Sequence, residues 1–238
     1  MDRCDRLDLV GRFFSGTGSS YNRVVRLATL GFDYRWKKKI VGMIPAGSAR
    51  IIDQACGTGI LTLMIARRFP QAGVTGIDVT EGYLQVAKKK VAALGLANIA
   101  LLQGRAEDVL PEGACDCVTS SYLAKYADLP ALVSNIKKML RPGGLLIMHD
   151  FTYPRNRVCA AAWRLYFRLL QGVGARLYPE WKTAFDDLPG LLLQTDWVGR
   201  LKGLLGASGF GEVRSEDLPF GAAAIVSARA GSGQAQAS

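Results

Sequence analysis

The sequence has few of the residues that build metal sites or disulfide frameworks. Its 238 residues include a single histidine and five scattered cysteines, Cys4, Cys56, Cys115, Cys117 and Cys159. Because the cysteine count is odd and the spacing fits no zinc motif, we expect no metal, and free thiols in a reducing cytosol. Alternation along a strand would place Cys115 and Cys117 on one face, with Asp116 on the other.

Long apolar runs are also absent. No stretch reaches the roughly 18 apolar residues of a membrane-spanning helix. The charged start, residues 1–6, is not followed by the apolar core of a signal peptide. We therefore expect a cytoplasmic protein, whose contact with a membrane would be peripheral.

The composition predicts one domain with a sizeable core, since 49% of the residues are hydrophobic. The formal net charge is +10, which favours nucleic acid, anionic lipid or another acidic partner. A basic, soluble surface without such a partner explains the charge equally well, so charge alone does not decide.

The most informative stretch is Asp53-Gln54-Ala55-Cys56-Gly57-Thr58-Gly59, between a buried strand and a helix. Glycines in such a turn reach φ above zero, and the helix start offers free N–H groups to a ligand. The dinucleotide fingerprint needs a third glycine where Thr62 stands. Asp53 would repel a pyrophosphate but suits a cationic ligand; an ordinary strand-to-helix turn is the alternative interpretation.

Strand and helix patterns alternate along the chain. We predict strands at 51–52, 73–78, 99–102, 115–120, 145–148, 210–214 and 222–227, and helices over 60–68, 81–94, 129–140 and 197–207. The run 141–144 is predicted to end the preceding helix in a turn. This alternation implies a parallel sheet covered by helices on both faces.

The carboxyl ends of the strands carry polar residues, as a ligand site in an open α/β sheet requires. Asp53 and Gly57 follow the first strand. Asp78 ends the second, about 20 residues after the glycine loop, where an acid binds ribose hydroxyls. The loop 103–111 follows the third strand.

The glycine-loop run resembles the first motif of class I S-adenosylmethionine-dependent methyltransferases, and residues 137–144 resemble their Leu-Lys-Pro-Gly-Gly turn. The resemblance implies an α/β, Rossmann-like seven-stranded sheet, mostly parallel, with an antiparallel terminal strand beside the fifth and helices on both faces. It also implies S-adenosylmethionine as cofactor. Arg105 departs from the family, which has Asp or Asn at that position. The implied cofactor-binding residues are Asp53, Ala55, Gly57, Thr58, Gly59, Asp78, Val79, Arg105, Ala106, Glu107, Ser120 and Ser121.

The run Tyr21-Asn22-Arg23 and the run from Leu30 to Lys37 resemble the opening of the ubiquinone/menaquinone biosynthesis C-methyltransferase family. This resemblance implies C-methylation of a quinol-type, lipophilic ring. The alternatives are O- or N-methylation of another aromatic or lipophilic molecule, a protein that binds S-adenosylmethionine without transfer, and a nucleotide-linked oxidoreductase.

Four residues are candidates for catalysis: Lys125, Tyr126, His149 and Asp150. Lys125 stands where the family has Arg, and either stabilises a phenolate or lies in solvent. Tyr126 either lines the acceptor site or packs in the core. His149 has a pKa suited to a base, or is structural. Strand alternation allows at most one of His149 and Asp150 to face the site.

The segment 155–178 is basic and aromatic, with arginines on one helical face and aromatic residues on another. It fits a membrane-surface helix, a cap on an apolar pocket, or a dimer or core helix. No RNA-stacking module accompanies it, so we expect no nucleic acid partner. The candidate substrate-binding residues are Tyr21, Tyr122, Tyr153 and Trp163.

We predict one methyltransferase domain over residues 1–230. It comprises an N-terminal helical cap (1–46), a cofactor-binding core (47–151), a helical insertion or lid (152–208) and C-terminal strands (209–230). The small, polar residues 231–238 are expected to form a disordered tail.

Overall fold

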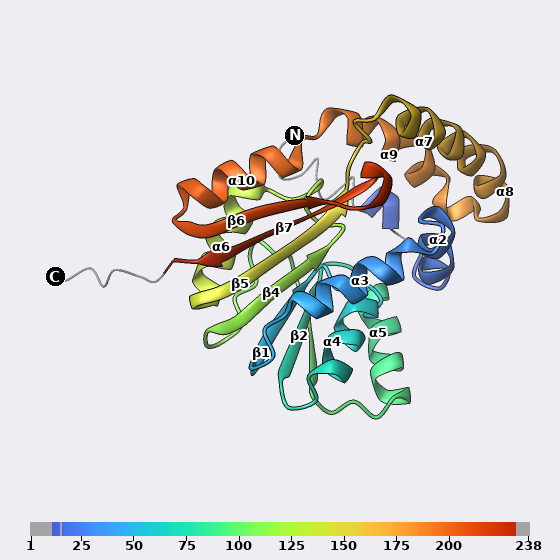
Figure 1. The fold of residues 1–238 in the computed structure, drawn as a ribbon. Helices are drawn as coiled ribbons and strands as arrows, with labels where there is room; N and C mark the ends of the chain where they lie inside the picture. The colour runs from blue at the N-terminus through green and yellow to red at the C-terminus, as the bar shows by residue number, and fades with distance from the viewer. Residues whose placement is uncertain (1–10, 15, 232–238) are drawn as a thin grey trace.

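The computed structural model describes residues 11–14 and 16–231, which build a seven-stranded sheet in the order β3-β2-β1-β4-β5-β7-β6 (Figure 1). The strands are β1 (Arg50–Gln54), β2 (Gly73–Asp78), β3 (Ile99–Gln103), β4 (Cys115–Ser121), β5 (Leu140–Phe151), β6 (Phe210–Asp217) and β7 (Ala223–Ala230). Strands β1 to β5 pair in parallel. Strand β7 lies antiparallel between β5 and β6, which confirms the predicted fold class.

Helices cover both faces of the sheet (Figure 1). On one side lie α3 (Phe32–Met43), α4 (Ile60–Arg68) and α5 (Glu81–Ala93); on the other lie α6 (Leu129–Met139) and α10 (Trp197–Ala207). Trp36 of α3 and Ile65 of α4 belong to one core cluster. Leu132 of α6 and Leu201 of α10 belong to the other. Central strands buried from both sides explain the nearly continuous apolar runs in the sequence.

A further helical layer lies beyond the carboxyl ends of the strands, at the right of Figure 1. It consists of α2 (Tyr21–Ala28) and, from the chain after β5, α7 (Arg157–Leu169), the π-helix η1 (Leu170–Gly174), α8 (Ala175–Leu177), η2 (Pro179–Trp181) and α9 (Lys182–Gln194). The indole N–H of Trp181 donates to Ser20 Oγ at 2.9 Å, and Tyr166 Oη donates to the Leu27 carbonyl. These bonds join the start of the chain to the insertion.

One local prediction was met in part and one was wrong. Helix α6 ends at Met139, just before the run 141–144 that was predicted to end it, and Gly143 has φ of 75°, but these residues belong to the irregular start of β5. The β4–β5 register shifts between Cys115 and Cys117, and simple alternation does not hold there: Cys115 packs in the core cluster with α6 and Cys117 in the cluster with α4. The two thiols therefore lie on opposite faces of the sheet.

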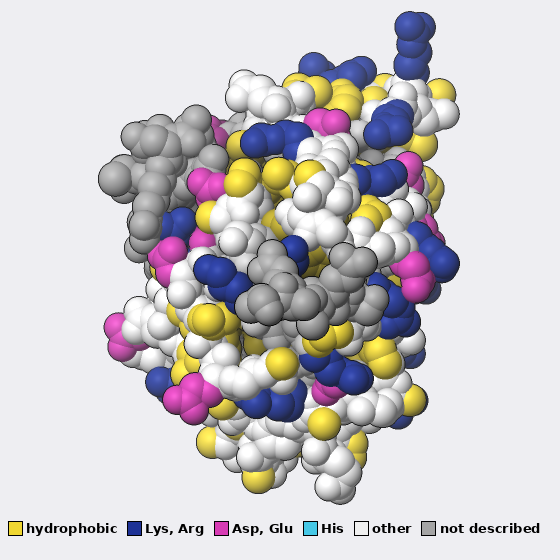
Figure 2. All heavy atoms as spheres, turned by 90° about the vertical axis from the view of Figure 1, so that its left-hand side faces the viewer, with side chains coloured by type: hydrophobic (Ala, Val, Ile, Leu, Met, Phe, Trp, Pro, Cys, Tyr) yellow, Lys and Arg dark blue, Asp and Glu magenta, His cyan; other side chains and the backbone are white. Residues whose placement is uncertain are grey.

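The predicted disordered tail falls almost wholly on residues 232–238, which lie outside the described residues. None of the described helices is long and apolar enough to cross a bilayer. Figure 2 shows one face of the molecule, where Lys and Arg side chains are spread among acidic and hydrophobic ones. On that face the net positive charge does not gather into a single binding stripe.

Candidate functional site

Two adjoining cavities lie at the carboxyl ends of the strands. The first, which we call the cofactor cavity, is lined by residues that follow four strands: Ala55 and Gly57 after β1, Asp78 and Val79 after β2, Gly104, Arg105, Ala106 and Glu107 after β3, and Ser121 after β4. Eight of the twelve predicted cofactor residues therefore meet here. Asp53 and Thr58 line a small extension of the same crevice, together with Lys37 and Tyr21.

Asp78 is fixed by backbone donors from two segments. Its Oδ2 accepts from Gly57 N at 2.8 Å, and its Oδ1 accepts from Thr80 N at 2.8 Å. Burial raises the pKa of this carboxyl, and the two backbone hydrogen bonds oppose the rise. Since each carboxylate oxygen has a second lone pair, the side chain keeps acceptor capacity towards the cavity that it lines.

Asp53 is buried more deeply. It accepts from Thr62 Oγ1 at 2.6 Å and Thr119 Oγ1 at 2.9 Å. Burial raises its pKa to about 6, and hydrogen bonds from these two hydroxyls limit the rise. The charge of Lys37 acts in the same direction as the hydroxyls. The crevice extension is therefore lined by both a carboxylate and an ammonium group.

Side-chain amides fix the loop after β3 through hydrogen bonds to its carbonyl groups. Asn135 Nδ2 on α6 donates to the carbonyls of Ala106 and Val109, both at 2.8 Å. Gln54 Nε2 at the end of β1 donates to the Ala106 carbonyl at 3.2 Å. The Arg105 guanidinium turns to Glu107, 3.5 Å away, so the loop presents itself to the cavity in a fixed conformation.

The second cavity, the acceptor cavity, has a volume of about 500 Å³ and lies under the helical layer. It shares Phe14, Tyr21, Tyr122 and Tyr126 with the cofactor cavity. The rest of its wall is largely aromatic and aliphatic, including Phe13, Val24, Trp163, Phe167, Trp181 and Phe185. A cavity of this size and apolarity suits a drug-sized lipophilic molecule.

Lys125 is the charged side chain that lines the acceptor cavity. Its side chain is 2% exposed, so it does not lie in solvent. Its Nζ contacts Asp150 Oδ1 at 2.6 Å and donates to the Tyr122 carbonyl at 3.1 Å. It also lies 4.4 Å from the centre of the Tyr126 ring. Burial lowers the pKa of Lys125, and the Asp150 carboxylate opposes this.

The side chains of His149 and Asp150 contact different residues. Asp150 reaches Lys125, whereas the His149 ring packs against Trp36 and Tyr122, with ring centres 5.4 and 4.9 Å apart. Neither residue is among those that line the two cavities. Burial lowers the pKa of His149 well below its ordinary value, and the positive charges of Lys37 and Lys125 lower it further. The imidazole is therefore neutral.

The structure places three other predicted residues outside the cavity walls. Gly59 is the residue before α4, with φ of 81°, and its role is to turn the chain. Ser120 is buried between neighbouring strands. Tyr153 accepts a hydrogen bond from Arg164 at 2.8 Å and packs edge-on against Trp163, which itself lines the acceptor cavity.

Several residues of the site were not predicted from the sequence. Tyr83 lines the cofactor cavity from α5, and Asn135 supports the loop after β3. Lys37 forms a buried ion pair with Asp33, and Asp33 also accepts from Tyr122 Oη at 2.7 Å. Lys37 ends the run from Leu30 to Lys37 that resembles the family's opening, and this resemblance was the signal that could have pointed to it.

No metal centre accompanies the two cavities: within residues 11–14 and 16–231, no group of three His, Cys, Asp or Glu side chains is arranged to hold an ion.

Comparison with known proteins relates the whole chain to one family. Residues 3–229 match the ubiE/COQ5 methyltransferase family. The chain is 33% identical over 216 residues to a demethylmenaquinone methyltransferase of Thermus thermophilus, covering 89% of this chain and 97% of that protein. It is 30% identical over 218 residues to the ubiquinone/menaquinone biosynthesis C-methyltransferase UbiE of Syntrophotalea carbinolica, covering 90% and 91%.

Solved structures share the fold at lower identity. A SAM-dependent methyltransferase from Aquifex aeolicus aligns with a TM-score of 0.58 and 14% identity, covering 96% of this chain and 98% of that one. Mitomycin 7-O-methyltransferase aligns with a TM-score of 0.60 and 20% identity, covering 84% and 54%. With its sheet order, its strand-end site and these relatives, the chain belongs to the ubiE/COQ5 methyltransferase family and is a SAM-dependent methyltransferase.

Proposed function

We propose that the protein binds S-adenosylmethionine in the cofactor cavity and methylates a ring carbon of a quinol-type, lipophilic acceptor held in the acceptor cavity. The observation that carries this proposal is the junction of the two cavities at Phe14, Tyr21, Tyr122 and Tyr126. One cavity is lined by acids at strand ends and the other by apolar rings. The names of the two relatives support a quinone precursor as the acceptor.

The residues present fit S-adenosylmethionine. Asp78, held by Gly57 and Thr80, would accept hydrogen bonds from ribose hydroxyls. In the crevice extension, Asp53 would bind the ammonium group of the amino-acid portion, and Lys37 would bind its carboxylate. Gly57 has φ of 56° and lines the cavity, so the backbone approaches the ligand closely. When bound, the cofactor supplies an electrophilic methyl group.

The chain's own contribution to transfer is orientation and charge stabilisation. Aromatic walls hold a flat ring and exclude water from the junction. The ammonium group of Lys125 has three N–H donors, of which Asp150 and the Tyr122 carbonyl engage two. We propose that the third stabilises the phenolate oxygen that makes the ring carbon nucleophilic. His149, neutral and packed behind Tyr122, serves as support for that ring.

A lipid-tailed acceptor resides in a membrane, so we propose that the protein works at a membrane surface from the cytoplasm. A homodimer stays a prediction of the sequence, as do the boundaries of the cap, core and insertion.

The function is tested by incubating the protein with S-adenosylmethionine and a reduced demethylated quinone. We expect S-adenosylhomocysteine and a ring-methylated quinol in equal amounts, identified by mass spectrometry. Methylation on oxygen, seen as loss of a titratable phenol, would instead establish the O-methyltransferase alternative. Tight cofactor binding with no product from any quinol would contradict the proposal.

Substitution at the cofactor cavity should weaken cofactor binding. We expect Asp78→Ala and Gly57→Val each to lower the affinity for S-adenosylmethionine by about tenfold or more, as measured by calorimetry. The first loses acceptors for the ribose, and the second places a branched side chain at positive φ in the cavity wall. Asp217→Ala, at an exposed acid in β6 that lines neither cavity, is the matched control. Wild-type affinity in both cavity variants would refute the placement.

Cofactor affinity should depend on pH through Asp53. Because its pKa is about 6 in the folded protein, the carboxyl is protonated below that pH and cannot pair with an ammonium group. We expect affinity to fall as the pH drops through 6, by up to roughly tenfold per unit. Calorimetry near pH 6 should show that binding releases protons. Asp53→Asn should bind weakly at every pH, and an unaltered pH profile in that variant would show that Asp53 is not the titrating group.

Lys125 should affect transfer more than cofactor binding. We expect Lys125→Gln to keep the dissociation constant of S-adenosylmethionine within about threefold, while turnover falls by on the order of a hundredfold. Because removing one partner of a buried ion pair is costly, Asp150→Asn/Lys125→Gln is measured alongside as the variant without an unpaired charge. Turnover at the wild-type level in the folded double variant would remove Lys125 from the reaction.

A further inference from the structure

An apolar stripe runs along the outer surface of the helical layer. Val158, Leu165, Leu169, Val173 and Leu177 follow one another at spacings of seven, four, four and four residues from α7 through η1 to α8. Each side chain is more than half exposed, with values between 53% and 77%. The opposite side of the same helices, with Phe167 and Leu170, is buried against α2 and α9. The segment is therefore apolar on both sides, and its outer side has no partner in the described chain.

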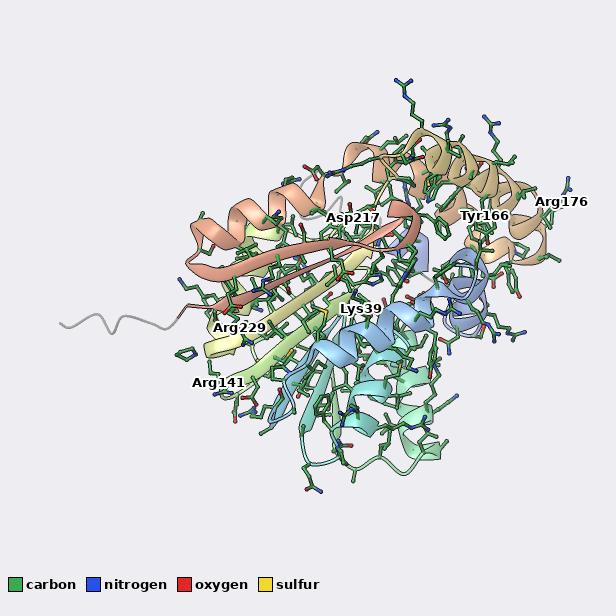
Figure 3. All side chains as sticks on the ribbon, viewed as in Figure 1. Lys39, Arg141, Tyr166, Arg176, Asp217 and Arg229 are labelled. Atoms are coloured by element: carbon green, nitrogen blue, oxygen red, sulfur yellow. The ribbon has the colours of Figure 1, made fainter. Side chains whose placement is uncertain are left out.

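Within the segment that carries this stripe, the charge has one sign. Residues 151–179 contain the five arginines Arg155, Arg157, Arg164, Arg168 and Arg176, and no lysine, aspartate or glutamate. All five arginines are exposed. Figure 3 shows Arg176 extending outward from α8, while Tyr166 turns inward beside α2. An exposed apolar face on a segment whose charged residues are all arginine is the pattern of a helix lying in the headgroup region of an anionic bilayer.

The mouth of the acceptor cavity opens beside the same stripe. Leu30, Val158 and Phe220 all line that cavity, yet their side chains are 67%, 77% and 65% exposed. Val158 belongs to both the cavity wall and the stripe. Cavity and stripe are therefore parts of one continuous apolar surface.

The backbone at the mouth is strained. Leu30 has φ of 50° and Phe220 has φ of 65°, values that bulky residues other than glycine rarely adopt. Such strain costs on the order of 1 kcal/mol or more per residue and persists where the surrounding structure imposes it. Both residues line the cavity while their large apolar side chains stay exposed at its opening.

We propose that this surface, the stripe together with the mouth at Leu30, Val158 and Phe220, docks on an anionic lipid bilayer. The acceptor's ring would then enter the cavity while its tail stays in the lipid. This inference rests on the proposed function for the nature of the acceptor. The docking itself rests on exposure, charge and the shared Val158. Charge favours a lipid surface over a second copy of this chain, because two such faces would bring ten arginines together.

The test is co-sedimentation with vesicles that contain no quinone and no cofactor. We expect the protein to bind vesicles of phosphatidylcholine mixed with phosphatidylglycerol, and to bind phosphatidylcholine alone more weakly. Leu165→Gln/Leu169→Gln should reduce binding about tenfold or more, since both side chains leave the apolar interface. Leu94→Gln/Leu110→Gln removes two leucines of similar exposure elsewhere and should bind like the wild type.

The arginines are tested separately. Arg168→Gln/Arg176→Gln should reduce binding to the anionic vesicles by roughly tenfold and flatten its salt dependence. Lys88→Gln/Lys89→Gln removes the same charge from exposed positions on α5 and should change binding little. Wild-type binding in the Leu165/Leu169 variant would overturn the proposal. So would a wild-type dimer that this variant converts to monomer, since the face would then join two copies.

An activity measurement separates this inference from the proposed function. Leu165 and Leu169 line neither cavity, so their variant should methylate a soluble, tail-less quinol at the wild-type rate. With a long-tailed quinol in vesicles, its methylation rate should be about tenfold lower than that of the wild type. If the wild type binds vesicles but methylates neither quinol, the proposed function fails and the docking surface stands. If both quinols are methylated equally by variant and wild type, the docking surface is wrong.

Discussion

The reversal of strand order at β1 and β4 is the constraint on which the site depends. Strands β2 and β3 extend the sheet from one side of β1, and β4 and β5 extend it from the other. Their connections therefore leave the carboxyl edge in opposite directions and open a crevice there. A hydrogen bond of 2.8 Å from Gly57 N to Asp78 Oδ2 joins the loop after β1 to the end of β2. Everything that binds at the strand ends is arranged around this crevice.

Tyr122 links the two halves of the chemistry. It follows β4 at φ of 67°, lines both cavities, and donates its hydroxyl to Asp33 of α3. Its carbonyl accepts from Lys125, and its ring packs against His149. A strained residue with this many constraints is typical of a functional site. Its ring forms part of the shared wall between the acid-lined cofactor cavity and the apolar acceptor cavity.

The same separation continues outward. The buried acids Asp53, Asp78 and Asp150 lie in the sheet near the strand ends, and the buried Asp33–Lys37 pair lies on α3, whereas the helical layer is apolar towards the cavity and along its outer stripe. A molecule with a ring and a long apolar tail would meet a continuous path from a lipid surface to the junction with the cofactor cavity. The arginines that flank this path add attraction to anionic lipid without placing charge in the cavity wall.

The sequence by itself determined the alternation of strands and helices and the polar residues at the strand ends. Those features depend on local signals, namely apolar runs, a glycine turn and acids at strand ends such as Asp53 and Asp78, whereas the antiparallel terminal strand was predicted from the family resemblance. Only the tertiary structure brought Asn135 to the loop after β3, paired Lys125 with Asp150 and brought Lys37 to the crevice that Asp53 lines. These partners come from different elements, so their proximity follows from packing rather than spacing. The shift of the β4–β5 register at Cys115 and Cys117 likewise depends on how the two strands pair, although the run 141–144 signals a local irregularity.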